Sequence, residues 1–543
     1  MCEYAVGRRY LNARTRAPLT LRYIGALPGL DSTWLGVEYD DPTRGKHSGE
    51  YNSVQFFRCH PGAGAFIKYS SASLPLVEGA DLVAALEDRY GGLEGEGANG
   101  REGADVVLLG DSRIVVEAPG MRDVVRRIGR LERLREVGFE NEWVSRLGGS
   151  ERQRIVLKQR LKGVRALDLS RNLIATWSDV GDIASHLTGL RVLILNHSRI
   201  QDVSSIASEE QKRLRDCFST VSELHLGKSA LSWAEAVDVA SLFPSLETLF
   251  LNHNSDIVTL SPRHDQNVKA AMARLKVLSI DGCGVDSWSN VACGLSALPS
   301  LTTAQLSELG IRSISPRGSA PAFPYLTGLT LVDTHISMWA DIDRLDDWTS
   351  GRLQKLRISC AGCEDGVPKQ NTDPLRMSGD VRSDRPLLIA KLAALKSLNG
   401  SNVTSAERWD SELFYIHYVD RLPAAERDAW GRYTELIQKH DVGPKAPPLK
   451  VSSNLKSKMI NLNVIPPNGM TMTLRLLPSA TAASLQKRVA RQMKVPAVRV
   501  WTARPHPEAP EAIGAWEPVE EMEEGQEIGH WVGDGDTVVV VVV

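Results

Sequence analysis

A repeated pair of apolar residues is the feature of this sequence that most constrains its fold. The pairs have the form Leu-x-Leu and follow one another at intervals of 25 to 31 residues. They are Leu167/Leu169, Leu193/Leu195, Leu224/Leu226, Leu249/Leu251, Leu278/Ile280, Ala304/Leu306, Leu329/Leu331 and Leu356/Ile358. Such a period indicates a repeat architecture, in which each unit is too small to bury its own apolar residues and packs against its neighbours.

Two further positions keep the same period. Three residues after six of the eight pairs comes a small polar side chain, at Asn172, Ser198, Ser229, Asn254, Cys283 and Thr334. Another aliphatic follows, at Ile174, Ile200, Leu231, Ile257, Val285, Ile311 and Ile336. We expect the polar groups to bond the backbone of the turn after each strand. This pattern is that of leucine-rich repeats, an α/β solenoid with a concave strand face, and Leu392, Leu395 and Leu398–Ser401 resemble the cap common after such repeats.

The residue between the two members of each pair is predicted to point outward. These residues are Asp168, Ile194, His225, Phe250, Ser279, Gln305, Thr330 and Arg357. Their mixed character favours a protein-binding surface over a small-molecule pocket. Because aromatic and Arg side chains supply much of the energy of protein interfaces, Phe250 and Arg357 are the candidate partner-binding residues of this face.

A basic loop follows an aromatic strand near the N-terminus. Two glycines let the segment Gly45-Lys46-His47-Ser48-Gly49 fold back with its donors outward. A cationic rim beside an aromatic floor fits an extended acidic peptide that ends in an aromatic residue and a free carboxylate. The candidate binding residues are Trp34, Gly45, Lys46, His47, Ser48, Gly49, Phe56, Phe57 and Phe66.

About residues 6–70 resemble a CAP-Gly domain, a small β-rich module that binds the acidic-aromatic C-terminal tails of tubulin and of microtubule-associated proteins. The matching segments are Arg22–Gly25, Trp34–Asp41, Gly45–Gly49, Phe56–Cys59 and Phe66–Lys68. The usual loop core is Gly-Lys-Asn-Asp-Gly, from which His47 and Ser48 depart, and Ser53 stands where a second glycine is expected. The resemblance implies a barrel-like β domain in which Lys46 contacts the carboxylate of the tail.

The C-terminal region has a different pattern. Strands are predicted at Met459–Val464 and Met470–Leu476, joined by the hairpin signal Pro466–Gly469. An amphipathic helix over Ala480–Met493 and strands at Val498–Trp501 and Thr537–Val543 follow. This order resembles a ubiquitin-like β-grasp domain. The final Val run is interpreted as a buried strand, and without a Gly-Gly tail we expect no conjugation by the usual chemistry.

The segments between these regions complete the division of the chain. We expect a helix over Ala80–Tyr90, a Gly/Glu-rich linker over Gly91–Gly103, strands at Val106–Leu109 and Ile114–Val116, and a helix over Leu131–Leu147. The predicted domains are a CAP-Gly domain (1–78), a connecting segment (79–150), a leucine-rich-repeat domain with its cap (151–420), a linker (421–455) and a ubiquitin-like domain (456–543).

Composition and motifs limit the function classes. The 543 residues carry a formal net charge of −2, which argues against nucleic-acid or membrane binding by the whole chain. Seven scattered cysteines indicate reduced thiols, and the pair Cys360/Cys363 has no second pair at zinc spacing. Gly227-Lys228-Ser229 resembles the end of a phosphate-binding loop, but Ser222 replaces its first glycine. We therefore expect no enzyme activity, no cofactor and no metal.

The order CAP-Gly, leucine-rich repeats and ubiquitin-like domain resembles the tubulin-specific chaperone E family, also called tubulin-folding cofactor E. The resemblance implies a cytoplasmic, cytoskeleton-associated, non-enzymatic chaperone that binds the α-tubulin tail through the first domain and the α-tubulin body through the repeats. It implies work with the β-tubulin-bearing cofactor and other tubulin-folding cofactors in assembly or dissociation of the αβ heterodimer. Two other functions stay open: a microtubule-end adaptor, and a ubiquitin-pathway adaptor whose last domain docks on the proteasome.

Overall fold

The computed structural model divides into two compact units, Met1–Leu309 and Gly310–Val543, and each is described by itself. It describes residues 4–90, 106–109, 114–117, 131–260, 265–319, 323–359, 375–378, 381–427, 430–441, 459–466, 471–505, 516–523 and 525–542. The predicted linker Gly91–Gly103, the pair Cys360/Cys363 and most of the predicted hairpin turn lie outside these residues. Within them, no helix is long and apolar enough to cross a membrane.

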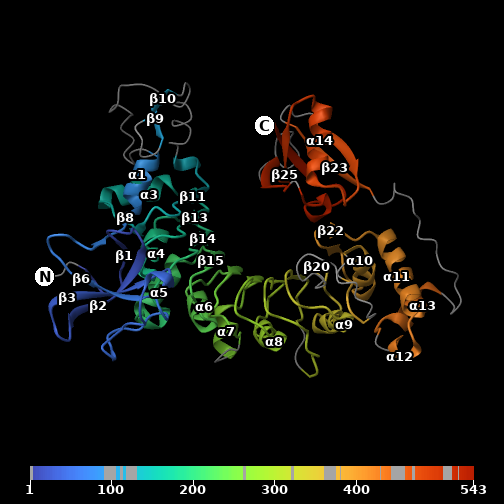
Figure 1. The fold of residues 1–543 in the computed structure, drawn as a ribbon, viewed down its shortest axis with the longest axis horizontal. Coiled ribbons are helices and arrows are strands. Elements are labelled where there is room, and N and C mark those ends of the chain that lie inside the picture. The colour runs from blue at the N-terminus through green and yellow to red at the C-terminus, as the bar shows by residue number, and fades with distance from the viewer. Residues whose placement is uncertain are drawn as a thin grey trace. The chain divides into compact units, whose positions relative to one another are not determined.

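The first unit begins with a five-stranded antiparallel sheet in the order β6-β3-β2-β1-β7 (Figure 1). Its strands are β1 Arg9–Asn12, β2 Pro18–Leu27, β3 Leu30–Tyr39, β6 Gly64–Lys68 and β7 Leu76–Val77. Alternate residues of β2 and β3 form the core: Leu19, Leu21, Leu35 and Val37 are all fully buried. The next residues along each strand therefore lie on the opposite face.

Between β3 and β6 the chain forms short elements. They are the 3-10 helix η1 Pro42–Arg44 and the hairpin of β4 Glu50–Tyr51 and β5 Val54–Gln55. The turn of this hairpin has two residues, Asn52 and Ser53, with φ of 47° and 63°. Left-handed backbone at both positions is the geometry of a type I′ hairpin turn, which glycine favours at its second position.

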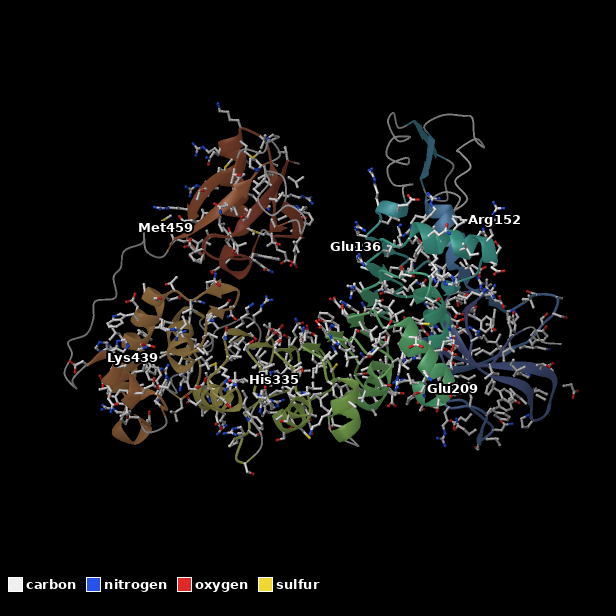
Figure 2. All side chains as sticks on the ribbon, turned by 180° about the vertical axis from the view of Figure 1, so that it is seen from behind. Glu136, Arg152, Glu209, His335, Lys439 and Met459 are labelled. Carbon is white, nitrogen blue, oxygen red and sulfur yellow. The ribbon has the colours of Figure 1, made fainter. Side chains whose placement is uncertain are left out.

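The connecting segment contradicts one prediction. Leu131–Leu147 is not a helix but contains η2 Leu131–Arg133, β11 Glu136–Gly138 and β12 Val144–Arg146 (Glu136 is labelled in Figure 2). Tertiary pairing decides the outcome, because β11 pairs in parallel with the first repeat strand and β12 pairs with β8 Ala80–Asp81. Asn141 and Trp143 also have left-handed φ, which a helix cannot contain.

Other predictions for this segment are confirmed. The helix α1 Leu82–Tyr90 follows β8, and β9 Val106–Leu109 pairs antiparallel with β10 Ile114–Glu117.

The repeats of the first unit form a parallel strand ladder, as predicted. Its strands, in spatial order after β11, are β13 Ala166–Asp168, β14 Val192–Ile194, β15 Glu223–His225, β16 Thr248–Phe250, β17 Val277–Ser279 and β18 Thr303–Gln305. Helical elements alternate with them: α3 Glu151–Arg160, α4 Trp177–Ala184, η3 Val203–Ser205, α5 Ser208–Cys217, α6 Trp233–Ala240, α7 Asp265–Ala271 and α8 Trp288–Ser296. The central residue of each strand is buried and pairs in register with the next one, as Leu193 does with Leu224.

The small polar residues also perform their predicted role. Asn172 is buried; its Nδ2 donates to the carbonyl of Phe139 at 2.7 Å and its Oδ1 accepts from the amide of Val144 at 2.8 Å. Asn254 makes the same kind of bridge, donating to the carbonyls of Leu226 and Leu251. These bonds satisfy backbone groups where the chain leaves the ladder.

The second unit contains the later repeats and their cap. Its ladder strands are β19 Gly328–Leu331, β20 Lys355–Ile358 and β21 Ser397–Leu398, which pair in parallel, and β22 Ser401–Asn402, which pairs antiparallel with β21. The helices are α9 Trp339–Trp348, α10 Val381–Lys391, α11 Ser405–Asp420, α12 Ala424–Arg427 and α13 Tyr433–His440. The fully buried ammonium of Lys391 bonds Asp343 at 2.7 Å and lies 4.5 Å from the ring of Trp430, which holds the cap helices together.

The C-terminal region folds into a mixed five-stranded sheet in the order β24-β23-β27-β25-β26. Its elements are β23 Ile460–Ile465, β24 Met472–Leu476, α14 Ala482–Met493, β25 Val498–Pro505, β26 Trp516–Glu521, η5 Ile528–His530 and β27 Thr537–Val542. The predicted hairpin, helix and last strand are confirmed, whereas β26 was not predicted. Val538 and Val540 of the final strand are buried, but Val541 and Val542 are exposed. The ubiquitin-like assignment stays a prediction.

Candidate functional site

The basic loop is held against β6 by backbone hydrogen bonds. The amides of Lys46 and His47 donate to the carbonyl of Gly64 at 2.8 and 3.2 Å, and the amide of Gly64 donates to the carbonyl of His47 at 2.8 Å. Asp41 starts the preceding 3-10 helix by accepting from the amide of Thr43. Lys46 is therefore presented from a fixed backbone, and its side chain is exposed.

Both glycines of the loop are required by close backbone approach. A Cβ at Gly45 would lie 2.1 Å from the carbonyl oxygen of Gly62. At Gly49, φ is 92° and a Cβ would lie 2.0 Å from the carbonyl oxygen of Phe57. Neither position admits a side chain without moving the backbone.

Phe66 is the centre of an aromatic cluster beside the loop. The ring centroids of His47, Phe57, Phe56, Tyr51 and Tyr23 lie 5.0, 5.5, 5.9, 6.1 and 6.4 Å from that of Phe66. Gly36 of β3 pairs with Phe66, and a Cβ there would lie 2.4 Å from the ring of Phe57. The structure thus brings together His47, Phe56, Phe57 and Phe66, as predicted, and adds Tyr23 and Tyr51.

Trp34 lies on the same face of β3 as Gly36, two residues away. It pairs with Lys68 of β6, but among the described rings it makes no contact with the Phe66 cluster. Its Nε1 is buried and has no hydrogen-bond partner in the described part of the chain. Trp34 therefore extends the aromatic face along β3 and is not part of the cluster itself.

Two lysines give this face its positive charge. Lys46 and Lys68 are exposed, and neither has an ion pair among the described residues. Two nearby arginines are neutralised: Arg22 pairs with Glu38 at 2.7 Å, and Arg44 pairs with Asp41 at 3.4 Å. A third, Arg58, follows Phe57 and is exposed, with no ion pair among the described residues. The two lysine ammonium groups are therefore available to a carboxylate from another molecule.

His47 and Ser48 occupy the loop in different ways. The Nδ1 of His47 accepts from the amide of Gly49 at 3.0 Å, which requires a neutral ring. Burial lowers the pKa of His47, with an opposing contribution from Glu50. Ser48 is half-buried, and its carbonyl accepts from Nε2 of Gln55 at 2.8 Å. Both residues shape the loop, and only Lys46 projects a charge from it.

The candidate residues on the repeat face have different surroundings. Phe250 of β16 is half-buried and stacks on His225, with ring centroids 4.3 Å apart and an interplanar angle of 27°. Arg357 of β20 is exposed and belongs to the second unit. One predicted outward residue, Ser279, is fully buried, and its hydroxyl donates to Oδ1 of Asn252 at 2.6 Å.

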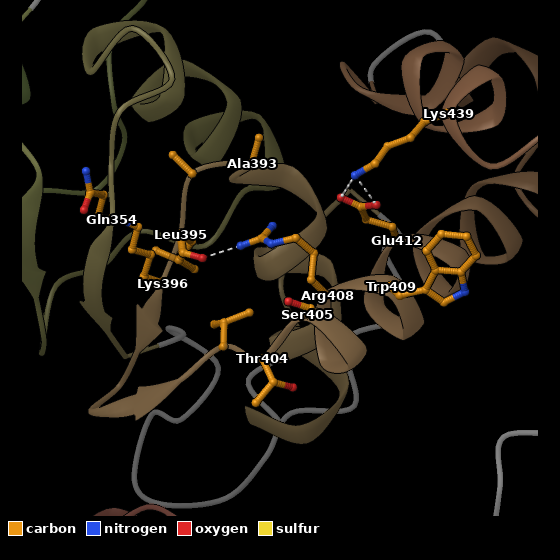
Figure 3. A pocket seen from close by; sticks show the side chains of 12 residues that line it. Gln354, Ala393, Leu395, Lys396, Thr404, Ser405, Arg408, Trp409, Glu412 and Lys439 are labelled. Carbon is orange, nitrogen blue, oxygen red and sulfur yellow. Dashed lines mark hydrogen bonds and ion pairs between the residues drawn. The ribbon is translucent and has the colours of Figure 1, made fainter.

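A cavity of about 430 Å³ lies in the repeat cap of the second unit (Figure 3). Glu412 of α11 accepts from Nζ of Lys439 with both oxygens, at 2.8 and 2.7 Å. Arg408 donates to the backbone carbonyls of three residues, among them Leu395. These charged groups already bond within the cap and serve to hold α10, α11 and α13 together.

Comparison with known proteins gives a match to the first domain alone and matches that extend over most of the chain. A model of the CAP-Gly domain family matches residues 6–72. The chain is 31% identical to tubulin-specific chaperone E of Bos taurus over 404 residues, which cover 73% of this chain and 69% of that protein. It is 29% identical to the Mus musculus protein of the same name over 504 residues, covering 88% of each.

A plant protein gives the same result. The chain is 30% identical to tubulin-folding cofactor E of Arabidopsis thaliana over 432 residues, which cover 77% of this chain and 74% of that protein. The similarity thus extends well beyond the CAP-Gly domain into the repeats. The chain belongs to the tubulin-specific chaperone E family.

Proposed function

We propose that the chain is a non-enzymatic tubulin-folding chaperone that binds α-tubulin. Its first domain holds the acidic-aromatic C-terminal tail of α-tubulin, and its repeats hold the folded body. With the β-tubulin-bearing cofactor and other folding cofactors, it takes part in assembly or dissociation of the αβ heterodimer in the cytoplasm, in association with the cytoskeleton. Membership of the chaperone E family supports this proposal, as do the charges and rings of the loop region.

The observation that carries the tail assignment is the unpaired Lys46 beside the Phe66 cluster. A charge-assisted hydrogen bond from Lys46 to a terminal carboxylate contributes about 1.5–3 kcal/mol. The rings of Phe56 and Phe66 are half-buried, so a tyrosine at the end of the tail gains edge-to-face contacts there, each of about 0.5–1.5 kcal/mol. Trp34, Gly45, His47, Ser48, Gly49 and Phe57 complete the proposed tail site.

The body assignment rests on the strand face of the repeats. A groove the size of the tail site cannot hold a folded subunit, because stable protein interfaces bury about 800 Å² per partner. We assign Phe250 and Arg357 to this interface, as an aromatic and an arginine with exposed surface. Two sites on one partner raise the overall affinity through effective concentration.

One mixing experiment tests the function directly. Purified full-length chain is incubated with αβ-tubulin, and complexes are separated by size and identified by subunit. A complex that contains α-tubulin without β-tubulin is the expected result. Decoration of the microtubule lattice with no effect on soluble dimers would favour a microtubule-end adaptor instead.

The tail site has its own test in the Lys46→Ala variant. We expect affinity for an acidic peptide ending in tyrosine to fall by about 1.5–3 kcal/mol in calorimetry. Arg14→Ala, which removes another exposed cation of the same domain, is the matched control and should bind like wild type. Equal affinity for the intact peptide and for one lacking its tyrosine would exclude this site.

A second function, docking on the proteasome, is favoured by one surface of the C-terminal sheet. Ile465, Val539 and Trp501 pair side by side across β23, β27 and β25, on the face opposite the buried Val538 and Val540. In a ubiquitin-like domain such a row is a docking surface. Co-sedimentation of the full chain with purified proteasomes, lost on Trp501→Ala, is the expected result; failure of the wild-type chain to co-sediment would exclude it.

A further inference from the structure

Three consecutive strands of the first unit present one row of apolar and aromatic side chains. Ile194, His225 and Phe250 are direct partners across β14, β15 and β16, and all three are half-buried. The stacked rings of His225 and Phe250 form the flat part of this row. Nε2 of His225 lies 2.7 Å from Oε1 of Glu223, which fixes the orientation of its ring.

The row has clear ends along the ladder. On one side, Ile194 is followed by Asp168 of β13, a charged residue whose carboxylate accepts from the amide of Ser170. On the other side it is Ser279 of β17, which is fully buried. The apolar surface is therefore limited to the middle three strands, an area that fits a single anchoring side chain of a partner and its immediate neighbours.

A second row follows the first at the ends of the same strands. Three residues after each member of the apolar row comes a basic or imidazole side chain: His197, Lys228 and His253. All three have left-handed φ, at 56°, 54° and 57°. Their amides donate to carbonyls of the next repeat at 2.8, 2.9 and 2.7 Å, so the three residues stack in the order of the ladder.

Acidic groups compensate this second row only weakly. Lys228 is exposed and has no ion pair among the described residues. His253 has its Nδ1 4.0 Å from Glu308, at the limit of an ion pair. Arg171, at the same position one repeat earlier, lies 3.7 Å from Glu140 and 3.4 Å from Nε2 of His197. The pKa of His197 is lowered by burial first and then by Arg171 and Lys228, while Glu140 and Asp40 oppose this shift.

We propose that the apolar row Ile194–His225–Phe250 and the basic row His197–Lys228–His253 form a binding site for an acidic segment of a protein partner. An apolar or aromatic side chain of the segment packs on His225 and Phe250, and its carboxylates contact Lys228 and the imidazoles. The proposal rests on the proposed function in assigning partner binding to the repeats, and it is independent of the proposed tail site.

A protein segment fits this surface better than single-stranded nucleic acid, although both combine aromatic stacking with cations. Nucleic acid requires a positively charged groove that follows several phosphates. Here Glu223 borders the apolar row, Asp168 is the last residue of the strand at one end of it, and Asp281 follows the strand at the other end. The chain as a whole carries a net charge of −2. A few carboxylates spaced along a peptide match the stacked ammonium group of Lys228 and the imidazoles of His197 and His253.

The test uses the full-length chain and a short Glu-rich peptide with one central phenylalanine and an amidated C-terminus. The amidated end removes the free carboxylate that the proposed tail site requires. We expect binding that weakens at least about tenfold when Lys228→Asn is combined with His253→Asn. Asparagine is chosen because it tolerates left-handed backbone. Lys212→Asn, which removes an exposed, unpaired cation from α5, is the matched control and should leave the affinity unchanged.

Further measurements test the aromatic contact and the specificity of the charge contacts separately. Replacing the phenylalanine of the peptide with alanine should weaken binding to wild type but not to Phe250→Ala, because the two rings are proposed to pack together. Equal losses in the double variant and in Lys212→Asn would show unspecific charge attraction and overturn the proposal, as would tighter binding of a single-stranded oligonucleotide at the same residues. Binding of the tyrosine-ended tail peptide, measured in parallel, reports on the proposed tail site and should stay unchanged in every one of these variants.

Discussion

Substitution of Gly45 by alanine isolates the contribution of loop geometry to tail binding. Gly45 has φ of −84°, which any residue adopts, so the substitution adds no backbone strain. The new Cβ would instead meet the carbonyl oxygen of Gly62 at 2.1 Å and the carbonyl carbon of Ala63 at 2.3 Å. Both are backbone atoms that cannot rotate away. The loop must therefore withdraw from β6 by about 1 Å, since overpacked contacts are relieved by backbone shifts.

The size of the effect follows from the bonds that the withdrawal breaks. Overpacking costs about 1–3 kcal/mol, and loss of the hydrogen bond from the Lys46 amide to Gly64 adds about 1 kcal/mol. Because Lys46 moves with the loop, we expect affinity for a tyrosine-ended acidic peptide to fall at least about tenfold, although its ammonium group is intact. Calorimetry measures the affinity, and hydrogen exchange at the Lys46 and His47 amides measures the loosening of the loop.

Gly138→Ala is the matched control for this variant. A Cβ at Gly138 would meet no atom within 4 Å, so we expect unchanged affinity and unchanged loop protection. The reasoning would be refuted if Gly45→Ala bound the peptide like wild type while its loop amides kept their protection. Weak peptide binding by Gly45→Ala with full hydrogen-exchange protection of its loop amides would also refute the reasoning, because the loss of affinity would then not result from a displaced loop.

Two other predictions concern the same domain. Ser53→Gly should stabilise the domain against urea by about 1 kcal/mol, because Ser53 has φ of 63° and non-glycine residues lose about that much in left-handed backbone; an unchanged or lower midpoint would contradict the turn assignment. The pKa of His47 is lowered by burial, so its contribution to stability is complete above its unfolded pKa of about 6.5 and is lost as the pH falls from there through its folded pKa. His47→Asn should therefore flatten this acid-side loss relative to wild type, and identical profiles in denaturant titrations would show that His47 does not cause it.

The repeats were predictable from the sequence because one physical requirement sets several positions at once. Each short strand buries its central apolar residue between its neighbours, as β14 buries Leu193. A polar residue such as Asn172 must then satisfy the backbone at the turn, so the two kinds of position indicate the repeat independently. The helix prediction at Leu131–Leu147 was wrong because the structure there depends on contacts that are remote in sequence. β11 has no repeat signal of its own, and only its pairing with β13 makes it a strand.

The loop and aromatic residues of the proposed tail site were predictable in composition but not in geometry. Glycine spacing and the Phe56–Phe57 pair indicated the loop and its aromatic floor, whereas Tyr23 and Tyr51 join the cluster through cross-strand and hairpin contacts that are remote in sequence. Tyr23 pairs with Gly36, and the missing side chain at Gly36 leaves room for the ring of Phe57. A glycine inside a predicted strand is the sequence signal that could have indicated this close packing of rings. The ion pairs of Arg22 and Arg44 with carboxylates leave Lys46 and Lys68 unpaired. These pairings are set by the tertiary structure, so no local sequence pattern predicts them.

The proposed tail site and the proposed site on β14–β16 lie in the same compact unit, Met1–Leu309. Within this unit, Arg8 next to β1 bonds Asp179 of α4 at 2.6 Å. A partner that occupies both sites makes its second contact at an effective concentration near the millimolar range, so its overall affinity exceeds that of either site by a factor of about 10²–10⁴. This linkage predicts different binding behaviour for the single variants Lys228→Asn and Lys46→Ala.

Lys228→Asn should leave tail-peptide affinity unchanged yet weaken binding of intact tubulin, while Lys46→Ala should weaken binding of intact tubulin and leave binding of tailless tubulin unchanged. Titrations of both variants with the peptide, intact tubulin and tailless tubulin separate these effects, because only intact tubulin can report the linkage. If Lys228→Asn bound intact tubulin as tightly as wild type, the acidic segment held on the repeats would have to come from a different molecule than the tail held by the first domain.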